Sequence, residues 1–350
     1  MRIEENKGVR TRHVAVETSM NGKTVLFTGA SRGMGRLAAI ELARRGARIL
    51  VVGHNEARGA AAVEAIRGIG ASAEFLRADL GDGAQVCALA EAVLAGGQRI
   101  DVLIHSAGGI APSGARTGEG VDRGFAQNFL GAFLLTRLLE ERLLAGAPAR
   151  VIAVGSGAHR LLKSVDVDAL MCPGKDLSRM GSYQRGAYQM LSYQTAKLAV
   201  TTWTYGLARR WAGRGVTANV LDPGIVKGAF GEQFEGPAPI RVLITHVIPF
   251  FVAVGTQRGS EQYVRLATDP ALATVSGMYF VSGKEKKEGS SRLSLDPEVQ
   301  KRIDEAAEAW AAPFLPAHLL TRPSASPSKN GGIEDVNVAV SPAKAKTEGL

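Results

Sequence analysis

The chain has 350 residues, of which 45% are hydrophobic and 21% are charged, which is typical of globular proteins and excludes disorder of the whole chain. Its formal net charge is +9, but the basic residues are scattered, with part of the excess near each end, and no basic face with interleaved aromatic residues emerges. We therefore expect no nucleic-acid partner.

The two cysteines, Cys87 and Cys172, cannot form a disulfide framework. Nothing near the start of the chain has the basic region, apolar stretch and small-residue cleavage site of a secretory signal. The cysteines also lack the local clusters of ligands that would indicate a metal site. We predict a cytoplasmic protein without a bound metal.

The sequence pattern divides the chain into three parts. Residues 1–20 are polar and aperiodic, and residues 321–350 are rich in Ser, Pro, Gly and Lys, so we expect a flexible amino-terminal segment and a disordered tail. Between them, in residues 21–320, apolar runs of strand length alternate with Ala- and Leu-rich stretches of helical period. The clearest runs are residues 25–27, 49–52, 102–104, 151–154 and 217–221. This succession predicts an α/β fold, a doubly wound parallel sheet with helices on both faces.

The first turn between a strand and a helix is rich in glycine. It reads TGASRGMG from Thr28 to Gly35, and the helical stretch LAAIELARRG follows one residue later. Without side chains at Gly29, Gly33 and Gly35, the backbone N–H groups and the helix dipole can receive a pyrophosphate. The position of this turn after a strand and before a helix predicts dinucleotide binding.

The TGxxxGxG spacing resembles that of the classical short-chain dehydrogenase/reductase family, and the family's other motifs follow in the same order. They are Asp79-Leu80 after the third strand, His105-Ser106-Ala107-Gly108 where the family usually has Asn-Asn-Ala-Gly, Asn128 in NFLG, Ser156 at the end of VIAVGS, Tyr193 and Lys197 in YQTAK, and Pro223-Gly224 after a strand. The resemblance covers about residues 23–310 and implies a single Rossmann-type catalytic domain.

The resemblance also implies a catalytic group of four residues. A carbonyl that accepts a hydride needs a proton, and Tyr193 would donate it, with the Lys197 ammonium lowering the phenol's pKa. Lys197 would also hold the nicotinamide ribose, Ser156 would donate a hydrogen bond to the substrate oxygen, and Asn128 would position a water. Ser156 as a polar strand end and Asn128 as the partner of a helix kink are the structural alternatives.

The second strand indicates which cofactor is used. A carboxylate at its end would bind the ribose hydroxyls of NAD and repel the 2′-phosphate of NADP, but Gly53 stands there. Arg32 and His54 offer groups that could contact the phosphate. NADP(H) is therefore favoured over NAD(H).

The resemblance implies a cofactor site drawn from several motifs. Its residues are Gly29, Ser31, Arg32, Gly33, Met34, Gly35, His54, Asp79, Leu80, Ser106, Ala107, Gly108, Tyr193, Lys197, Pro223, Gly224 and Val226. Two departures suggest a looser grip on the cofactor: His105 and Ser106 replace the usual asparagines, and the usual Thr after Pro-Gly is absent.

The long segment between Ser156 and Tyr193, and the closing region, resemble those of the retinol-dehydrogenase and WW-domain-oxidoreductase-like branch. That branch acts on bulky lipophilic alcohols and carbonyls, so we expect a retinoid-, steroid- or polycyclic-ketone-like substrate. Two alternatives stay open: a secondary-metabolite ketoreductase that tailors polyketides, and a non-catalytic NADP(H)-binding scaffold.

A substrate-binding lid is expected at about residues 225–260. Within it, residues 240–255 are apolar but too short and too interrupted for a membrane span. We expect Phe250 and Phe251 to line the lid. A membrane-surface contact is the less favoured alternative, and a homo-oligomer is also open.

Overall fold

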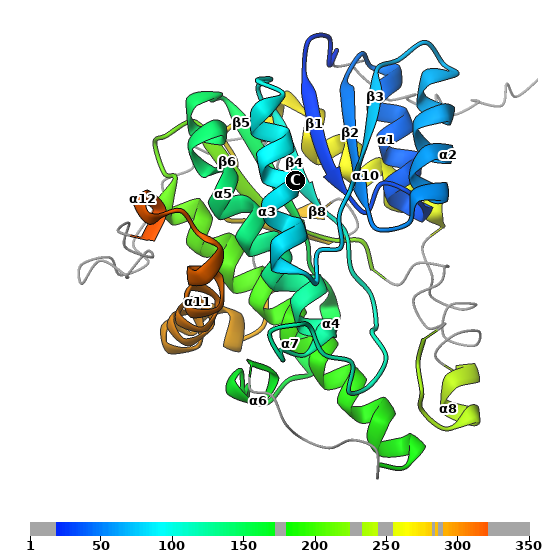
Figure 1. Ribbon diagram of the computed structural model, residues 1–350, viewed down its shortest axis with the longest axis vertical. Coiled ribbons are helices and arrows are strands. Elements are labelled where there is room, and N and C mark those ends of the chain that lie inside the picture. The colour runs from blue at the N-terminus through cyan, green and yellow to red at the C-terminus, as the bar shows by residue number, and fades with distance from the viewer. Residues whose placement is uncertain are drawn as a thin grey trace, which may run out of the picture.

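The computed structural model describes residues 19–171, 180–224, 233–243, 255–281, 284–285 and 290–320 (Figure 1). Its sheet has the strand order β3-β2-β1-β4-β5-β6-β7-β8; the first seven strands are parallel, and β8 pairs antiparallel with β7. The strands are β1 (Thr24–Thr28), β2 (Arg48–Gly53), β3 (Ala73–Arg77), β4 (Val102–His105), β5 (Ala149–Val154), β6 (Val216–Asp222), β7 (Tyr279–Val281) and β8 (Lys284–Glu285).

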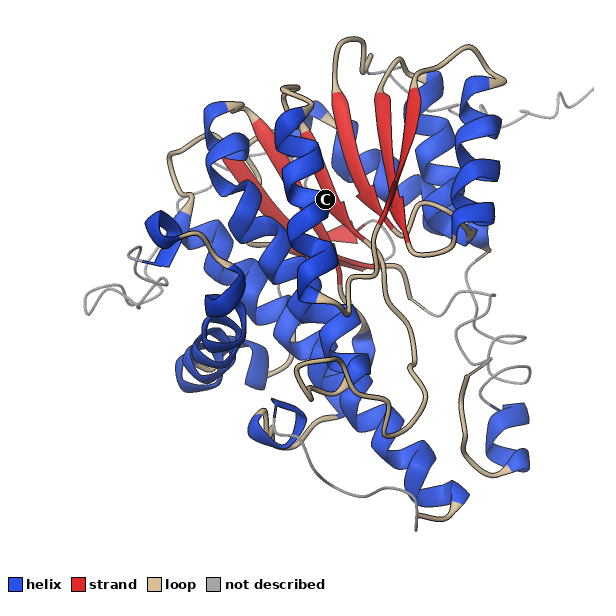
Figure 2. Ribbon diagram, in the orientation of Figure 1, coloured by secondary structure: helices blue, strands red, loops and turns tan. Residues whose placement is uncertain are grey.

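Helices cover both faces of the sheet, as Figure 2 shows. One apolar core lies between the sheet and α1 (Gly33–Arg44), α2 (Glu56–Arg67) and α10 (Thr256–Thr268). The other lies under α3 (Gly83–Ala95), α5 (Gly131–Ala145) and α7 (Ser182–Arg210). The shorter or peripheral helices are α4 (Arg123–Phe125), the π-helical turn η1 (Ala126–Leu130), the 3-10 turn η2 (Gly157–Leu161), α6 (Asp168–Met171), α8 (Ala238–Val242), α11 (Pro297–Ala311) and α12 (Ala317–Leu320). The predicted doubly wound α/β fold is confirmed.

The strand sequences explain the burial of the sheet. β1 is buried along its whole length, and the central residues of β2 are buried on both faces, because a parallel sheet between two helical layers has no solvent face. The strand order reverses between β1 and β4. At such a switch point the loops after neighbouring strands separate and leave a crevice at the carboxyl ends of the strands.

Most of the predicted amino-terminal segment, the whole predicted tail and parts of the predicted lid lie outside the described residues. Residues 1–18, 225–232, 244–254 and 321–350 are not described. Met20 already belongs to the domain, since it is buried and its N–H donates to the carbonyl of Arg45. Within the described residues, no helix is long and apolar enough to cross a membrane.

The long helix α7 is covered near its carboxyl end by α11 (Figure 1). Ile303 and Ala307 of α11 are fully buried in the same core as Trp203 of α7. Asp304, between them, lies beside Gly206 of α7. Burial raises the pKa of Asp304 to about 6, although the arginines Arg209 and Arg210 act in the opposite direction.

We expect Asp304→Asn to stabilise the protein at alkaline pH. The folded-state pKa lies above the unfolded value, so an ionised Asp304 destabilises the fold above about pH 6, and this cost disappears as the pH falls toward 4. The free energy of unfolding should rise by about 1–2 kcal/mol at pH 8, allowing for partial solvent screening, and should stay nearly unchanged at pH 4. Urea unfolding at both pH values measures it. Glu64→Gln, on the exposed face of α2, is the matched control, and an equal gain at both pH values would contradict the assignment.

Candidate active site and cofactor cavity

The glycine-rich turn after β1 has the geometry that the sequence predicts. Gly29 has φ +79°, and a Cβ there would lie 2.7 Å from the backbone N of Ala107. A Cβ at Gly35 would lie 2.5 Å from the Gly29 carbonyl oxygen, so both positions require glycine. Gly33, with φ +57°, has open space on its Cβ side. Because Arg32 caps α1 without a side-chain hydrogen bond, the first amides of this helix remain available to an anion.

A cavity of about 450 Å³ opens at this turn, which is within the usual range of small-molecule sites. Twelve of the predicted cofactor residues line it: Gly29, Ser31, Arg32, Gly33, Met34, Gly35, His54, Asp79, Leu80, Ser106, Ala107 and Gly108. The sequence analysis missed Val52, Ala78, Gly109, Ile110, Gln127, Gln233 and Thr256 and named Gly53 only for its missing carboxylate. Gly109 and Gln127 adjoin predicted residues, whereas Gln233 and Thr256 come from distant segments without a motif.

The end of β2 lies against the glycine-rich turn. A Cβ at Gly53 would lie 3.3 Å from the Ser31 hydroxyl oxygen. Arg32 and His54, which follow these two residues in the chain, both line the cavity. No carboxylate projects from the end of this strand. The lining therefore fits a dinucleotide and contains a cationic side chain on the side where the second strand ends.

Two neighbouring groups of the protein hold the Asp79 side chain in place. Its carboxylate forms an ion pair with Arg123 of α4 and accepts a hydrogen bond of 2.9 Å from the Gly81 N–H. Two donors thus fix the orientation of the side chain predicted to meet the adenine. No motif in the sequence indicates Arg123 as the partner, because it lies far from Asp79 along the chain.

Hydrogen bonds at the end of β4 hold the altered Asn-Asn-Ala-Gly motif in place. The Ser106 hydroxyl lies 2.8 Å from the Tyr263 hydroxyl of α10, and the Thr28 hydroxyl accepts from the backbone N–H groups of Ser106 and Ala107. His105 points to the opposite face, where its Nε2 lies 2.8 Å from the Thr136 hydroxyl. Complete burial lowers the pKa of His105 to about 3, so this side chain is neutral.

Tyr193 and Ser156 come together at the carboxyl ends of the central strands. Tyr193 is 8% exposed, and Ser156 begins the turn that follows β5. Burial raises the pKa of Tyr193 to about 12, while a hydrogen bond with Ser156 acts in the opposite direction. The expected lowering of this pKa is therefore wrong for the structure, because the desolvation of the phenolate and the negative charge of Asp222 outweigh the hydrogen bond with Ser156.

Lys197 lies one helical turn from Tyr193, with its Nζ 5.6 Å from the centre of the phenol ring. Its ammonium donates a 2.8 Å hydrogen bond to the Val154 carbonyl at the end of β5. Burial lowers the pKa of Lys197 to about 8, although the charge of Asp222 opposes this. The ammonium is thus charged at neutral pH and lies near Gly108, where a Cβ would be 3.7 Å from Nζ.

Asn128 lies in the π-helical turn η1 and is 3% exposed. Its amide nitrogen donates to the carbonyls of Gly109 (2.8 Å) and Gly124 (2.7 Å), and its oxygen accepts from the Gly109 N–H (3.0 Å). The side chain therefore fastens the loop after β4 to the irregular helix. This is close to the structural alternative, the partner of a helix kink, and leaves its amide engaged with the backbone.

Asp222 at the end of β6 lies close enough to Tyr193 and Lys197 to affect the pKa of both. Asp222 accepts hydrogen bonds from the Tyr279 hydroxyl (2.9 Å) and the Gly224 N–H (2.9 Å), and its charge acts on both Tyr193 and Lys197. Four predicted cofactor residues in the described part of the chain do not line the cavity: Tyr193, Lys197, Pro223 and Gly224. Val226 lies outside the described residues, so its predicted cofactor contact stays a prediction.

Within the described ranges, no group of three or more metal-binding side chains is found. Cys87 is a free thiol, half-buried, with a raised pKa because of burial. Cys172 lies outside the described ranges.

The fold and these motifs define a class of protein. The chain belongs to the short-chain dehydrogenase family, whose model matches residues 23–164, and it is an NAD(P)-dependent oxidoreductase of alcohols and carbonyls. Human retinol dehydrogenase 14 is 33% identical over 304 residues, which cover 83% of this chain and 86% of the relative. Human retinol dehydrogenase 12 is 34% identical and covers 74% of this chain and 77% of its own.

Solved structures give the same result. A structure titled a putative NAD(P)-dependent gluconate 5-dehydrogenase from Beutenbergia cavernae, with bound NADP at low occupancy, is 29% identical with a TM-score of 0.59 and covers 75% of this chain and 96% of its own. A dehydrogenase/reductase from Sinorhizobium meliloti is 27% identical with a TM-score of 0.57 and covers 75% and 94%. The resemblance inferred from the motifs is confirmed.

We expect Asn128→Ala to destabilise the protein and weaken cofactor binding. The change removes three hydrogen bonds and takes the Asn128 partner from the buried Gly124 carbonyl and from the half-buried Gly109 N–H. Loss of the partner of a buried polar group costs about 1–3 kcal/mol. Urea unfolding should show a loss of at least that size, and a titration with NADPH should show weaker binding, because Gly109 lines the cavity. Gln127→Ala, which removes a single 3.2 Å bond to the Gly109 carbonyl, is the control and should cost less. Equal stability of both variants would contradict this role.

Proposed function

We propose that the protein is an NADP(H)-dependent oxidoreductase that interconverts a carbonyl and an alcohol on a lipophilic substrate. The observation that carries the proposal is the meeting of Tyr193, Ser156 and Lys197 at the carboxyl ends of the central strands, beside a cavity lined by the glycine-rich turn. These three residues and Asn128 are the proposed catalytic group.

When bound, the nicotinamide supplies or takes up the hydride. In the direction of reduction, Tyr193 donates its proton to the carbonyl oxygen, and its raised pKa keeps that proton in place at neutral pH. The Ser156 hydroxyl donates a hydrogen bond to the same oxygen as negative charge develops there. The charged Lys197, 5.6 Å from the phenol ring, stabilises the phenolate left behind. Asn128 keeps the loop at Gly109 in position.

The choice of NADP(H) rests on charge at the end of β2. Gly53 presents no carboxylate to the ribose, and the cationic Arg32 and the imidazole of His54 line the cavity there. The solved gluconate 5-dehydrogenase relative from Beutenbergia cavernae holds NADP at low occupancy, which agrees with this choice.

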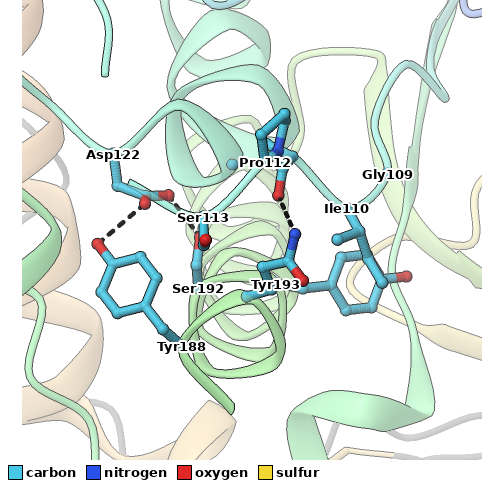
Figure 3. Close-up of a pocket in the computed structure, with 11 residues that line it drawn as sticks. Gly109, Ile110, Pro112, Ser113, Asp122, Tyr188, Ser192 and Tyr193 are labelled. Carbon is cyan, nitrogen blue, oxygen red and sulfur yellow. Dashed lines mark hydrogen bonds between the residues drawn. The ribbon is translucent and has the colours of Figure 1, made fainter. Parts of the chain in front are cut away.

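A lipophilic substrate is proposed from the relatives and from the walls near Tyr193. The relatives are named retinol dehydrogenases, and Ile110 and Pro112 present apolar surface beside the phenol (Figure 3). We propose that residues 225–260 form the lid over this substrate, with Phe250 and Phe251, which lie outside the described residues, facing it. A cytoplasmic location is part of the same proposal.

The polyketide-tailoring ketoreductase uses the same catalytic group, so only the substrate separates it from the favoured function. A non-catalytic scaffold would have no need for the buried Tyr193 and Lys197 pair. An NADPH-consumption screen across retinoids, steroids, quinones and polycyclic ketones tests the proposal, and no turnover of any of them would contradict it.

Tyr193→Phe should lower kcat by roughly 10²–10⁴, the range for a positioned acid, while NADPH affinity stays nearly unchanged. The reason is that only the proton donor is lost, and the phenol ring keeps its packing. Steady-state kinetics and an NADPH titration measure both effects. Tyr183→Phe is the matched control, because Tyr183 lies on the same helix and is 69% exposed. A variant that keeps most of the wild-type rate would disprove the mechanism.

Gly53→Asp combined with Arg32→Ser should reverse a preference for NADPH over NADH. The new carboxylate would bind the ribose hydroxyls and repel the 2′-phosphate. Its Cβ would lie 3.3 Å from the Ser31 hydroxyl oxygen, a tight contact, so the Ser31 side chain has to move by a few tenths of an ångström. Loss of a charge-assisted contact should weaken the binding of NADPH by about tenfold to hundredfold. Fluorescence titrations measure the two dissociation constants, with Arg44→Ser as a control on the exposed part of α1. Equal affinities in the unmodified protein would refute the assignment.

A further inference from the structure

Four side chains of α7 recur at intervals of four residues: Arg185, Gln189, Tyr193 and Lys197. Residues spaced in this way share one face of a helix. The last two form the proposed catalytic pair. The first two contact residues 233–237, which we call the anchored segment. One face of α7 therefore carries the proposed catalytic pair and, nearer its amino-terminal end, contacts the anchored segment.

Gln189 joins two separate pieces of chain. Its amide nitrogen donates to the carbonyls of Ala111 (2.9 Å) and Gln233 (2.8 Å), and its amide oxygen accepts from the Glu235 N–H (2.8 Å). The side chain is 3% exposed. Because these three partners are backbone groups, the contact fixes the path of both segments, whatever their side chains are.

Glu235 makes a second connection between the same segments. Its carboxylate accepts from the Ser113 N–H (3.0 Å) and the Ser113 hydroxyl (2.6 Å), and it lies 3.3 Å from Arg185. The two connections thus run from α7 to the anchored segment and from the anchored segment to the loop after β4.

The backbones of α7 and the anchored segment are in direct contact. A Cβ at Gly186 would lie 2.7 Å from the Cα of Gly236 and 2.9 Å from the ring of Phe234, which is itself 5% exposed. The absence of a side chain at Gly186 allows this approach. The anchored segment is therefore packed as well as hydrogen-bonded.

The loop held by Gln189 forms the wall beside the proposed proton donor. In Figure 3, Ile110 lies next to Tyr193, and Pro112 and Ser113 continue the wall. The space enclosed there is about 10 Å³, close to what one water needs, so the position of this wall decides what fits beside Tyr193. Gln233, at the other end of the contact, lines the cofactor cavity.

We propose that Gln189 is a positioning residue that sets substrate size, by holding residues 110–113 and the anchored segment together one helical turn from Tyr193. The inference rests on the proposed function, because it assigns this wall to the carbonyl substrate. With the contact intact, the wall is a fixed apolar surface against which a lipophilic substrate packs. With the contact broken, the wall is displaced and the discrimination between large and small carbonyls falls.

The first test needs no substrate. Gln189→Met keeps a side chain of similar length and removes all three hydrogen bonds. Amide hydrogen exchange of the peptides that contain Ser113 and Glu235 should speed up in this variant. Gln184→Met is the matched control, since Gln184 is exposed on the same helix and bonds only the nearby Gly181 N–H. Unchanged exchange in Gln189→Met would overturn the proposed contact, whatever the enzyme's substrate.

The second test is kinetic, with retinal as the bulky carbonyl and propanal as the small one. We expect KM for retinal to rise about tenfold, the equivalent of one lost hydrogen bond in binding, with less than a twofold change in KM for propanal. Equal changes for both carbonyls, or a fall in kcat alone, would overturn the role in substrate size. Absence of turnover of either carbonyl by the unmodified protein would instead contradict the proposed function, and the exchange result would still stand.

Glu235→Gln weakens the second connection between the same segments and suits the case where Gln189→Met does not fold, because Glu235 is one-third exposed. It should weaken the bonds to Ser113 and Arg185 and raise KM for retinal in the same direction. The double variant should show less than the product of the two single effects, as expected for residues in one network. Independent, multiplicative effects would overturn the proposal.

Discussion

The site depends on one backbone contact, between the turn after β1 and the end of β4. Gly29 approaches Ala107 so closely that a Cβ would lie 2.7 Å from its nitrogen, and the Thr28 hydroxyl accepts from the amides of Ser106 and Ala107. This contact closes one end of the crevice that the reversal of strand order opens. The cofactor cavity, the position of Gly108 near Lys197 and the loop held by Asn128 all follow from it.

Around that contact, burial shifts the pKa values of the ionisable side chains more than nearby charges do. The Tyr193 phenol is kept protonated, the Lys197 ammonium is brought to a pKa of about 8, and His105 is kept neutral behind the sheet. A phenol that holds its proton suits a proton donor, and a nearby ammonium suits the stabilisation of the phenolate that remains. The desolvated setting therefore accounts for the chemistry better than a simple lowering of the phenol's pKa.

Helix α7 links this chemistry to the substrate side. Its face carries Lys197 against β5, Tyr193 beside Ser156, and Gln189 against the loop after β4. A rigid helix transmits the position of one end to the other, since its residues share a continuous hydrogen-bonded backbone. A single element thus holds Lys197, the proposed proton donor Tyr193 and the proposed substrate wall, and the carboxyl-terminal helix α11 covers its far end.

Sequence alone determined the alternation of strands and helices and the glycine-rich turn, and it predicted the catalytic group, because these depend on local periodicity and on motifs of fixed spacing. Twelve cofactor residues predicted in this way line the cavity. The tertiary structure alone decided the contacts between distant segments: Asp79 with Arg123, Ser106 with Tyr263, and Gln189 with Gln233. It also reversed the expected shift in the pKa of Tyr193. The physical reason is that burial and long-range hydrogen bonds arise only when the chain folds back on itself, and no spacing along the sequence records them.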